Sequence, residues 1–322
     1  MKLRGFFTST IGSFPLDDSE SNRERCLKDL IKLRIDFPVY PQLTDMGKQF
    51  LDDLVKQHCG ITVKRGRYTL SSSEIGLSIQ PPLGLEPFQW TMKYLKEKNL
   101  KMNVKASITG PFTLASYIEI GLGTAPFNTA ISNIKLIDYL AQIISESCSV
   151  ASKEASMISI DEPILSVIVG KKIPFKYGEE DVIRIFNALR EKCGEIPVGI
   201  HVCGKISPKL AGLLLKTTMD FLSHEFHDTP ENLDVFNPKH LKEGEKILSV
   251  GCISSKNPYV ESPQEILDLM NKFRNYGDCL IFTPDCGFRN LIVEGSKEKG
   301  YEVAIRKLRN MVEATMKFKE IA

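Results

Sequence analysis

The sequence predicts one (β/α)8 TIM barrel, an α/β fold in which helices surround a ring of parallel strands. Eight short segments rich in β-branched and aromatic residues alternate with longer helical patterns along the 322 residues, and such alternation is typical of parallel sheets. No repeat or linker divides the chain, so we expect a single domain over residues 1–322. Polar residues also collect where the strand-like segments end, which is the active-site rim of this fold.

Glycine, proline and helical stretches separate the expected strands. The strands are expected at residues 6–11, 37–43, 103–109, 157–161, 198–204, 220–226, 246–253 and 279–284. The main helices are expected near residues 21–33, 45–57, 128–155, 179–192, 208–217, 263–276 and 299–319. Residues 60–87 lack a clear period, and we interpret them as an insertion that contains a small hairpin.

The composition is that of an ordinary globular protein, with 42% hydrophobic and 25% charged residues. A formal charge of +2 provides no basic field for nucleic acid. No apolar run approaches the roughly 20 residues of a membrane span, and the N-terminal residues lack a signal-peptide pattern. The 8 cysteines show no paired spacing. We therefore expect a cytoplasmic protein without nucleic-acid or membrane partners, in which any special cysteine binds metal or reacts.

The expected strand at residues 198–204 carries two metal-binding side chains. Side chains alternate along a strand, so His201 and Cys203 share one face. An imidazole and a thiolate at this spacing can reach one soft metal ion, and zinc is favoured. The pair alone also fits a packed histidine beside an inert buried cysteine. The metal interpretation therefore depends on further ligands.

Two later strand ends offer those ligands. Glu225 lies near the end of the sixth expected strand, and Cys286 follows the eighth. With the first two residues they form a His, Cys, Glu and Cys set that suits zinc. His224 or His227 could take the place of Glu225. Cys252 ends the seventh expected strand on the same rim, and the remaining cysteines are interpreted as structural.

Five motifs give the sequence a resemblance to a known family. In chain order they are Ile11-Gly12-Ser13-Phe14-Pro15, Ile160-Asp161-Glu162-Pro163, His201-x-Cys203, Glu225 and Pro284-Asp285-Cys286-Gly287. They resemble, in the same order, the motifs of the catalytic C-terminal barrel of cobalamin-independent methionine synthase. The resemblance covers nearly the whole chain.

The resemblance implies a zinc-dependent methyltransferase that converts L-homocysteine into L-methionine, with one zinc ion per chain. The implied zinc ligands are His201, Cys203, Glu225 and Cys286. The implied homocysteine-binding residues are Ile11, Gly12, Ser13 and Asp161, of which Asp161 holds the amino group. Zinc deprotonates a thiol whose ordinary pKa is about 8.5, so the metal would prepare the nucleophile. Without the resemblance, Asp161 could be a strand-end cap and Gly12-Ser13 an ordinary turn.

The folate half of the family's site differs in this sequence. A histidine that protonates folate is matched here by Lys256, a folate-side tryptophan by Tyr117, and a folate-contacting glutamate by Val167. A glutamate of the homocysteine pocket is matched by Gln42. Single-barrel members of the family are thought to take the methyl group from a methylcorrinoid protein, and we predict that donor here. Tyr117, Cys252 and Lys256 are the candidate donor-side residues.

Two other functions fit parts of the pattern. One is a zinc-dependent methyltransferase acting on coenzyme M or another small thiol, which predicts a sulfonate pocket in place of Asp161. The other is a non-catalytic zinc-binding or corrinoid-associated scaffold, which predicts a closed four-ligand metal site.

Overall fold

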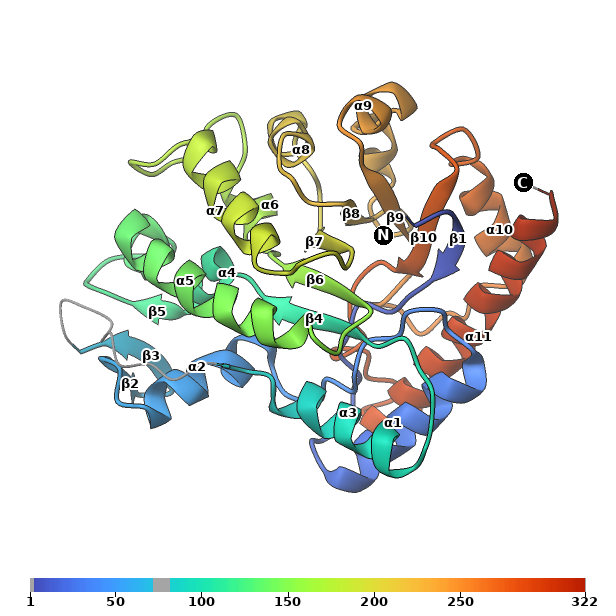
Figure 1. The fold of residues 1–322 in the computed structure, drawn as a ribbon, viewed down its shortest axis with the longest axis horizontal. Helices are drawn as coiled ribbons and strands as arrows, with labels where there is room; N and C mark the ends of the chain where they lie inside the picture. The colour runs from blue at the N-terminus through green and yellow to red at the C-terminus, as the bar shows by residue number, and fades with distance from the viewer. Residues whose placement is uncertain (1–2, 72–81, 322) are drawn as a thin grey trace.

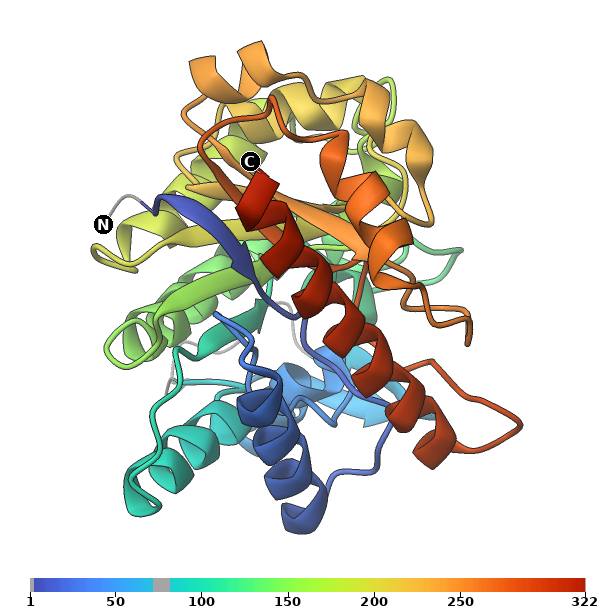
Figure 2. The same ribbon diagram turned by 90° about the vertical axis from the view of Figure 1, so that its right-hand side faces the viewer.

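A curled parallel sheet of seven strands forms the centre of the molecule, and helices cover its outer face (Figure 1, Figure 2). The computed structural model describes residues 3–71 and 82–321. The strand order is β1-β10-β9-β8-β7-β6-β4, with all pairs parallel. The strands are β1 (Gly5–Thr8), β4 (Lys105–Thr109), β6 (Met157–Asp161), β7 (Val198–Val202), β8 (Phe221–Glu225), β9 (Ile247–Ile253) and β10 (Cys279–Pro284). Seven of the eight expected strands are thus confirmed.

The remaining expected strand, residues 37–43, does not form a regular ladder. It lies between the two edge strands and contacts both through isolated bridges, Ser9 to Phe37 and Val39 to Lys105. The Phe37 N–H donates to Thr8 O at 3.0 Å, and the Lys105 N–H donates to Pro38 O at 2.8 Å. Prolines at positions 38 and 41 remove two backbone donors from this segment, which prevents continuous pairing.

The helices begin and end at recognisable signals. Ser19 caps the first helix by accepting from the Asn22 N–H at 3.3 Å, and Ser262 forms a capping box with Glu265. The expected helix at 128–155 is divided, because Asn133 caps a shorter helix after one 3-10 turn. The helices are α1 (Glu20–Leu33), α2 (Met46–Lys56), α3 (Glu86–Glu97), α4 (Pro111–Tyr117), α5 (Ile134–Ala151), α6 (Leu165–Ile168), α7 (Glu179–Glu191), α8 (Pro208–Leu215), α9 (Pro238–Glu243), α10 (Pro263–Asn271) and α11 (Lys297–Ile321), with 3-10 turns at Ala130–Ser132 and Pro230–Asp234.

The expected insertion contains the predicted hairpin. Strands β2 (Ile61–Lys64) and β3 (Arg67–Leu70) pair antiparallel, and β3 also pairs parallel with β5 (Ile118–Glu119) to form a separate three-stranded sheet. Both residues of the connecting turn, Arg65 and Gly66, have positive φ, which is typical of a two-residue hairpin turn. Residues 72–81 of the expected insertion lie outside the described residues, and the end of the insertion overlaps the start of α3.

The inward face of the sheet changes from apolar to polar along the strands. At the N-terminal end, Leu3, Phe37, Met157, Phe221 and Ile281 form a buried cluster. The Phe221 ring occupies the space that a side chain at Gly199 would need. Further along the same faces, serines replace these hydrophobic residues: Ser107 and Ser159 are register partners on β4 and β6, and Ser223 and Ser249 are register partners on β8 and β9. The polar layer lies directly beneath the strand ends that carry the candidate site.

Helix α11 closes the chain against the two strands next to it. Its Phe318 ring packs edge-on against Phe6 of β1 at 4.9 Å and Phe282 of β10 at 5.1 Å between ring centroids. Among the helices of the described residues, none is both long enough and apolar enough to cross a membrane.

Candidate metal and substrate site

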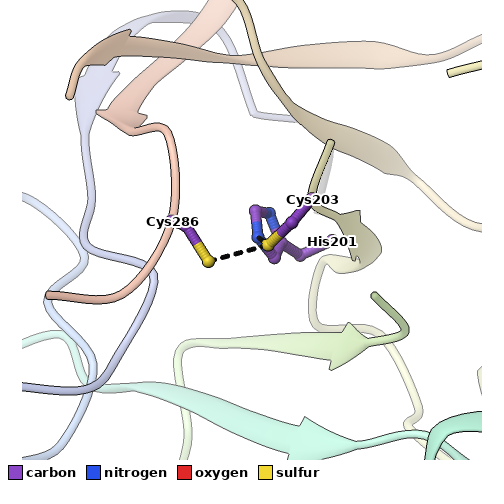
Figure 3. Close-up of side chains that lie close together, drawn as sticks. All are labelled: His201, Cys203 and Cys286. Carbon is purple, nitrogen blue, oxygen red and sulfur yellow. Dashed lines mark hydrogen bonds between the residues drawn. The ribbon is translucent and has the colours of Figure 1, made fainter. Parts of the chain in front are cut away.

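Three predicted metal ligands converge at the C-terminal edge of the sheet (Figure 3). His201 lies on β7, Cys203 follows it, and Cys286 follows β10 from the far side of the site. The distance from His201 Nε2 to Cys203 Sγ is 2.9 Å, and the distance between the two Sγ atoms is 2.7 Å. The three ligand atoms all lie within 4.8 Å of one another. One nitrogen and two sulfur donors form a set that suits zinc.

The His201 ring is held in the form that binds metal. It is buried, and burial lowers its pKa to about 3, so the imidazole is neutral at physiological pH. Its Nδ1 atom lies 3.1 Å from the Ser223 hydroxyl on β8, which leaves Nε2 facing the two sulfur atoms. Ser223 was not predicted as a functional residue. Ser223 lies two residues before Glu225 on the same strand face, and this spacing is the sequence signal that points to a hydroxyl behind the metal ligands.

The Cys203 thiol needs a nearby cation to become a thiolate at neutral pH. Cys203 and Cys286 are both free cysteines. The neighbouring Cys286 thiol and burial raise the pKa of Cys203 well above its ordinary value. A divalent ion at this point would reverse that shift, because coordination deprotonates a thiol. The donor set and its burial therefore fit zinc.

Glu225, the fourth predicted ligand, is not part of this group of three. Its carboxylate is 1% exposed and forms an ion pair with Lys256, with Oε2 3.1 Å from Nζ. The Thr229 hydroxyl also donates to Oε2, at 2.9 Å. The structure thus brings three of the four predicted ligands together and places the fourth in a different set of contacts.

The histidine and cysteine alternatives lie elsewhere. His224 lies on the opposite strand face from Glu225, its Nδ1 donates to Val202 O at 3.2 Å, and its ring stacks on Phe236. The His227 ring contacts Asp228, with Nδ1 2.9 Å from Oδ1. Cys252 is buried and donates to the Thr283 carbonyl at 3.4 Å. Within the described part of the chain, none of these three side chains belongs to the group of His201, Cys203 and Cys286.

Asp285 joins the end of β8, where Glu225 lies, to the loop that carries Cys286. It is fully buried, and its carboxylate accepts the backbone N–H groups of Phe226, His227 and Asp228 at 3.1, 3.1 and 2.6 Å. These three bonds join the end of β8 to the residue directly before Cys286. Asp285 therefore fixes the position of the Cys286 loop relative to the end of β8.

Asp161 lies at the end of β6, in register with His201 on β7. Its two oxygens accept hydrogen bonds from the hydroxyls of Ser107 and Ser159. Burial raises the pKa of Asp161 to about 6, against the lowering effect of both serines and of the buried Lys105. A carboxylate held this way can accept a further bond from a substrate ammonium group.

The predicted homocysteine loop lies against the loop of Cys286. The Phe288 N–H donates to Ser13 O at 2.7 Å, and the backbone of Ser13 also bridges to Gln42. Ile11 is buried beside them, and a Cβ on Gly12 would lie 2.6 Å from Gln42 Oε1. Gly12 also has a φ of 152°, a conformation that other residues rarely adopt, so this position favours glycine.

The candidate donor-side residues are dispersed around the rim. Tyr117 ends α4 and is 39% exposed, and Val167 on α6 is 73% exposed. The Lys256 ammonium contacts Glu225, as described above. Cys252 is buried away from the metal group and does not reach this rim.

Comparisons with known proteins identify the family of this architecture. Residues 80–317 match the family model described as "Cobalamin-independent synthase, Catalytic domain". The chain belongs to this family. It is 31% identical over 324 residues to the methionine synthase of Methanothermobacter marburgensis, covering 98% of this chain and 94% of that protein. It is 29% identical over 248 residues to the methionine synthase of Methanocaldococcus jannaschii, covering 73% and 71%.

Solved structures agree with the fold. A B12-independent methionine synthase from Shewanella sp. W3-18-1, in complex with selenomethionine, aligns with a TM-score of 0.67 at 19% identity, covering 98% of both chains. A putative B12-independent methionine synthase from Listeria monocytogenes aligns at 0.66 and 14%, covering 99% of both. The family resemblance drawn from the five motifs is confirmed, and the chain is an enzyme of the methyltransferase class.

Proposed function

We propose that this enzyme transfers a methyl group to the sulfur of L-homocysteine and forms L-methionine, with one zinc ion per chain. Membership of the cobalamin-independent synthase family and the methionine synthase relatives support the reaction. The observation that carries the zinc assignment is the convergence of His201, Cys203 and Cys286 within 4.8 Å. Glu225 is proposed as a fourth ligand, which would have to leave Lys256 to reach the metal.

A bound zinc ion would supply Lewis-acid stabilisation of a thiolate at neutral pH. The chain's own residues bind and orient the amino acid. Asp161 accepts from the ammonium group, Gln42 adds a second acceptor, and the Gly12-Ser13 backbone closes the pocket beside Cys286. This orientation places the homocysteine sulfur beside His201, Cys203 and Cys286, where a bound zinc ion would hold it ready for methyl transfer.

The proposed methyl donor is a methylcorrinoid carried by a separate protein. The homocysteine sulfur forms a bond to the methyl carbon, and the carbon–cobalt bond breaks with both electrons remaining on cobalt. The leaving cobalt(I) species needs no proton. In this site Lys256 is ion-paired with Glu225, so its ammonium group stabilises a carboxylate and is poorly placed to protonate a leaving group.

We also infer that residues 37–42 complete an eight-stranded barrel. The bridges from Phe37 to Ser9 and from Val39 to Lys105 support this closure. A closed ring would align the Gln42 side chain with the other strand ends and place it on the same rim as Asp161.

A thiol substrate with a sulfonate, such as coenzyme M, fits the pocket less well. The Gln42 amide oxygen faces the space beside Gly12, and the Ser107 hydroxyl at the same place donates to the Asp161 carboxylate, so negative charge density gathers there. An anion placed there would be repelled, whereas an ammonium group would be attracted.

The test uses the purified full-length enzyme. We expect one zinc per chain by elemental analysis, and methionine formation from homocysteine with methylcobalamin as a chemically simple methylcorrinoid. Coenzyme M under the same conditions is expected to react far more slowly. Absence of stoichiometric zinc would contradict the metal assignment, and preferential methylation of coenzyme M would contradict the substrate.

A further inference from the structure

A chain of buried hydrogen bonds leads from the loop at Gly84 to the pocket beside the metal group. Gln49 on α2 is 8% exposed, and its Nε2 donates to the Gly84 carbonyl and to the Tyr40 hydroxyl, the latter at 2.9 Å. The Tyr40 hydroxyl in turn donates to the Ser107 carbonyl at 2.7 Å. Gln42 Nε2 donates to Gln49 Oε1 at 3.2 Å.

The direction of these bonds is determined by chemistry. The Gly84 carbonyl oxygen can only accept, so the Gln49 NH2 group must face it. Gln49 Oε1 then faces Gln42 and can only accept, so the Gln42 NH2 group must face Gln49. The Gln42 amide oxygen is left pointing the other way. Among the described residues, no donor forms a hydrogen bond to it.

That oxygen borders the proposed substrate pocket. A Cβ built on Gly12 would lie 2.6 Å from Gln42 Oε1 and 3.6 Å from Ser107 Oγ. The same Ser107 hydroxyl donates to Asp161. Ser107 thus connects the Asp161 carboxylate to the place beside Gly12 that the amide oxygen faces, so the two acceptors lie near each other.

We propose that Gln49 is a positioning residue that locks the Gln42 amide with its oxygen toward the pocket, and that this arrangement selects thiol substrates carrying a protonated amino group. The inference rests on the proposed function and adds the origin of its selectivity. Without Gln49, the Gln42 amide can rotate and present its NH2 group, which repels an ammonium. Gln49 does not touch the substrate, so its effect passes through Gln42.

The test compares two thiols that differ only in the amine. L-Homocysteine and 4-mercaptobutanoate share the thiol, carboxylate and chain length. Binding of each to the zinc-loaded enzyme is measured by calorimetry, and the ratio of the two affinities is the readout. Zinc content is measured for every variant, because a change in metal occupancy would affect both thiols equally.

In Gln49→Met we expect the homocysteine affinity to fall about tenfold, as a hydrogen bond to a charged group is lost. The affinity for 4-mercaptobutanoate is expected to change less than about twofold, so the ratio falls about tenfold. Gln42→Met is expected to give the same loss. The double variant should be no worse than Gln42→Met alone, because Gln49 acts through Gln42.

Two further variants separate positioning from general destabilisation. Asp53→Asn weakens the bond from the Gly84 N–H to Asp53 Oδ2, at 3.0 Å, without touching Gln42, and should keep the wild-type ratio. Gln49→Asn retains an amide but is one methylene too short to reach both Gln42 and Gly84, and replaces Gln49→Met if that variant does not fold. An unchanged affinity ratio in either Gln49 variant would overturn the role of Gln49 and would leave the proposed substrate untouched. A wild-type enzyme that binds both thiols equally would overturn the proposed substrate as well.

Discussion

Lys256 Nζ lies 3.1 Å from Glu225 Oε2, which joins a largely exposed lysine to a carboxylate that is 1% exposed. The pair links the loop after β9 to the end of β8. Because the lysine is 62% exposed, solvent weakens its attraction for the carboxylate. If Glu225 is the fourth ligand proposed above, its carboxylate would exchange between this lysine and a metal ion bound by His201, Cys203 and Cys286. Catalytic zinc sites keep such an exchangeable position for the substrate.

Replacing Lys256 with methionine should strengthen metal binding. Glu225 then loses its competing partner, and a buried carboxylate without a counter-charge gains more from binding a cation. We expect zinc affinity to rise severalfold in competition with a chelator, and methyl transfer to slow because Glu225 occupies the substrate position. Lys297→Met is the matched control, since Lys297 pairs with Asp17 and not with Glu225. Equal zinc affinities in Lys256→Met and wild type would contradict an exchangeable Glu225.

Cys203→Ser and Cys286→Ser should each abolish stoichiometric zinc and methionine formation. A serine hydroxyl does not ionise at neutral pH and is a poor zinc ligand, so one of three converging donors is lost. Zinc per chain by elemental analysis is the primary measurement. Cys252→Ala is the control because Cys252 is buried but bonds only to the Thr283 carbonyl. A Cys286→Ser protein that retains full zinc would remove Cys286 from the ligand set.

Ser223→Ala should weaken zinc binding by about 10- to 100-fold while leaving the ligands themselves intact. The Ser223 hydroxyl contacts His201 Nδ1 at 3.1 Å and holds the ring with Nε2 toward the sulfur atoms. Chelator competition measures the affinity. Ser249→Ala removes the register neighbour of Ser223 on β9 and is the matched control. If both serine variants bind zinc equally well, the hydroxyl does not orient the ring.

The pKa of Asp161, raised by burial to about 6, predicts how ligand binding depends on pH. Only the ionised carboxylate pairs with an ammonium group, so affinity should rise from pH 5 to pH 7 and then level off. L-Methionine is the appropriate ligand because it has the same amino group and no titrating thiol. Calorimetry at constant zinc content measures the profile. Asp161→Asn should bind weakly with little pH dependence below pH 7, and a wild-type-like profile in this variant would exclude Asp161 as the titrating group.

The same shift carries a stability cost. The folded pKa of about 6 lies above the ordinary value of 3.8, so the folded state loses stability as pH rises through that interval. At pH 7 the cost is up to about 3 kcal/mol. Asp161→Asn is therefore expected to unfold at a higher temperature than the wild type near neutral pH, even though it binds substrate less well. Scanning calorimetry with and without bound zinc provides the comparison.

Local patterns in the sequence are sufficient to predict most of the strands and part of the candidate site. Alternation along β7 places His201 and Cys203 on one face, and the polar strand end at Asp161 indicates the rim. The strand expected at residues 37–43 forms only isolated bridges, because Pro38 and Pro41 lack the backbone N–H that a continuous ladder needs. The strand propensity of a residue does not show whether the segment can form continuous backbone hydrogen bonds with its neighbouring strands.

Long-range side-chain bonds could not be predicted in this way. The pair of Lys256 and Glu225 joins a loop to a strand end 31 residues away, and the bond from Gln49 to the Gly84 carbonyl joins a helix to a loop 35 residues away. Neither contact produces a periodic pattern. Both depend on how the curled sheet places neighbouring strand ends, which is why Glu225 is predicted as a ligand without its partner Lys256.

The choice of methyl donor is the last prediction and depends on Lys256. Methyl transfer from methyltetrahydrofolate leaves an amine anion that must be protonated as it departs. A histidine suits this role near neutral pH, whereas the Glu225 carboxylate raises the pKa of the Lys256 ammonium and makes it a weaker acid. We therefore expect methionine from methylcobalamin or a methylcorrinoid protein and none from methyltetrahydrofolate with one or several glutamates. Methionine is quantified after incubating the zinc-loaded enzyme and homocysteine with each donor, and Lys256→His tests whether an added acid allows folate turnover. Faster methionine formation from methyltetrahydrofolate than from either corrinoid in the wild-type enzyme would reverse the donor assignment, because it would require a proton donor other than Lys256 within the site.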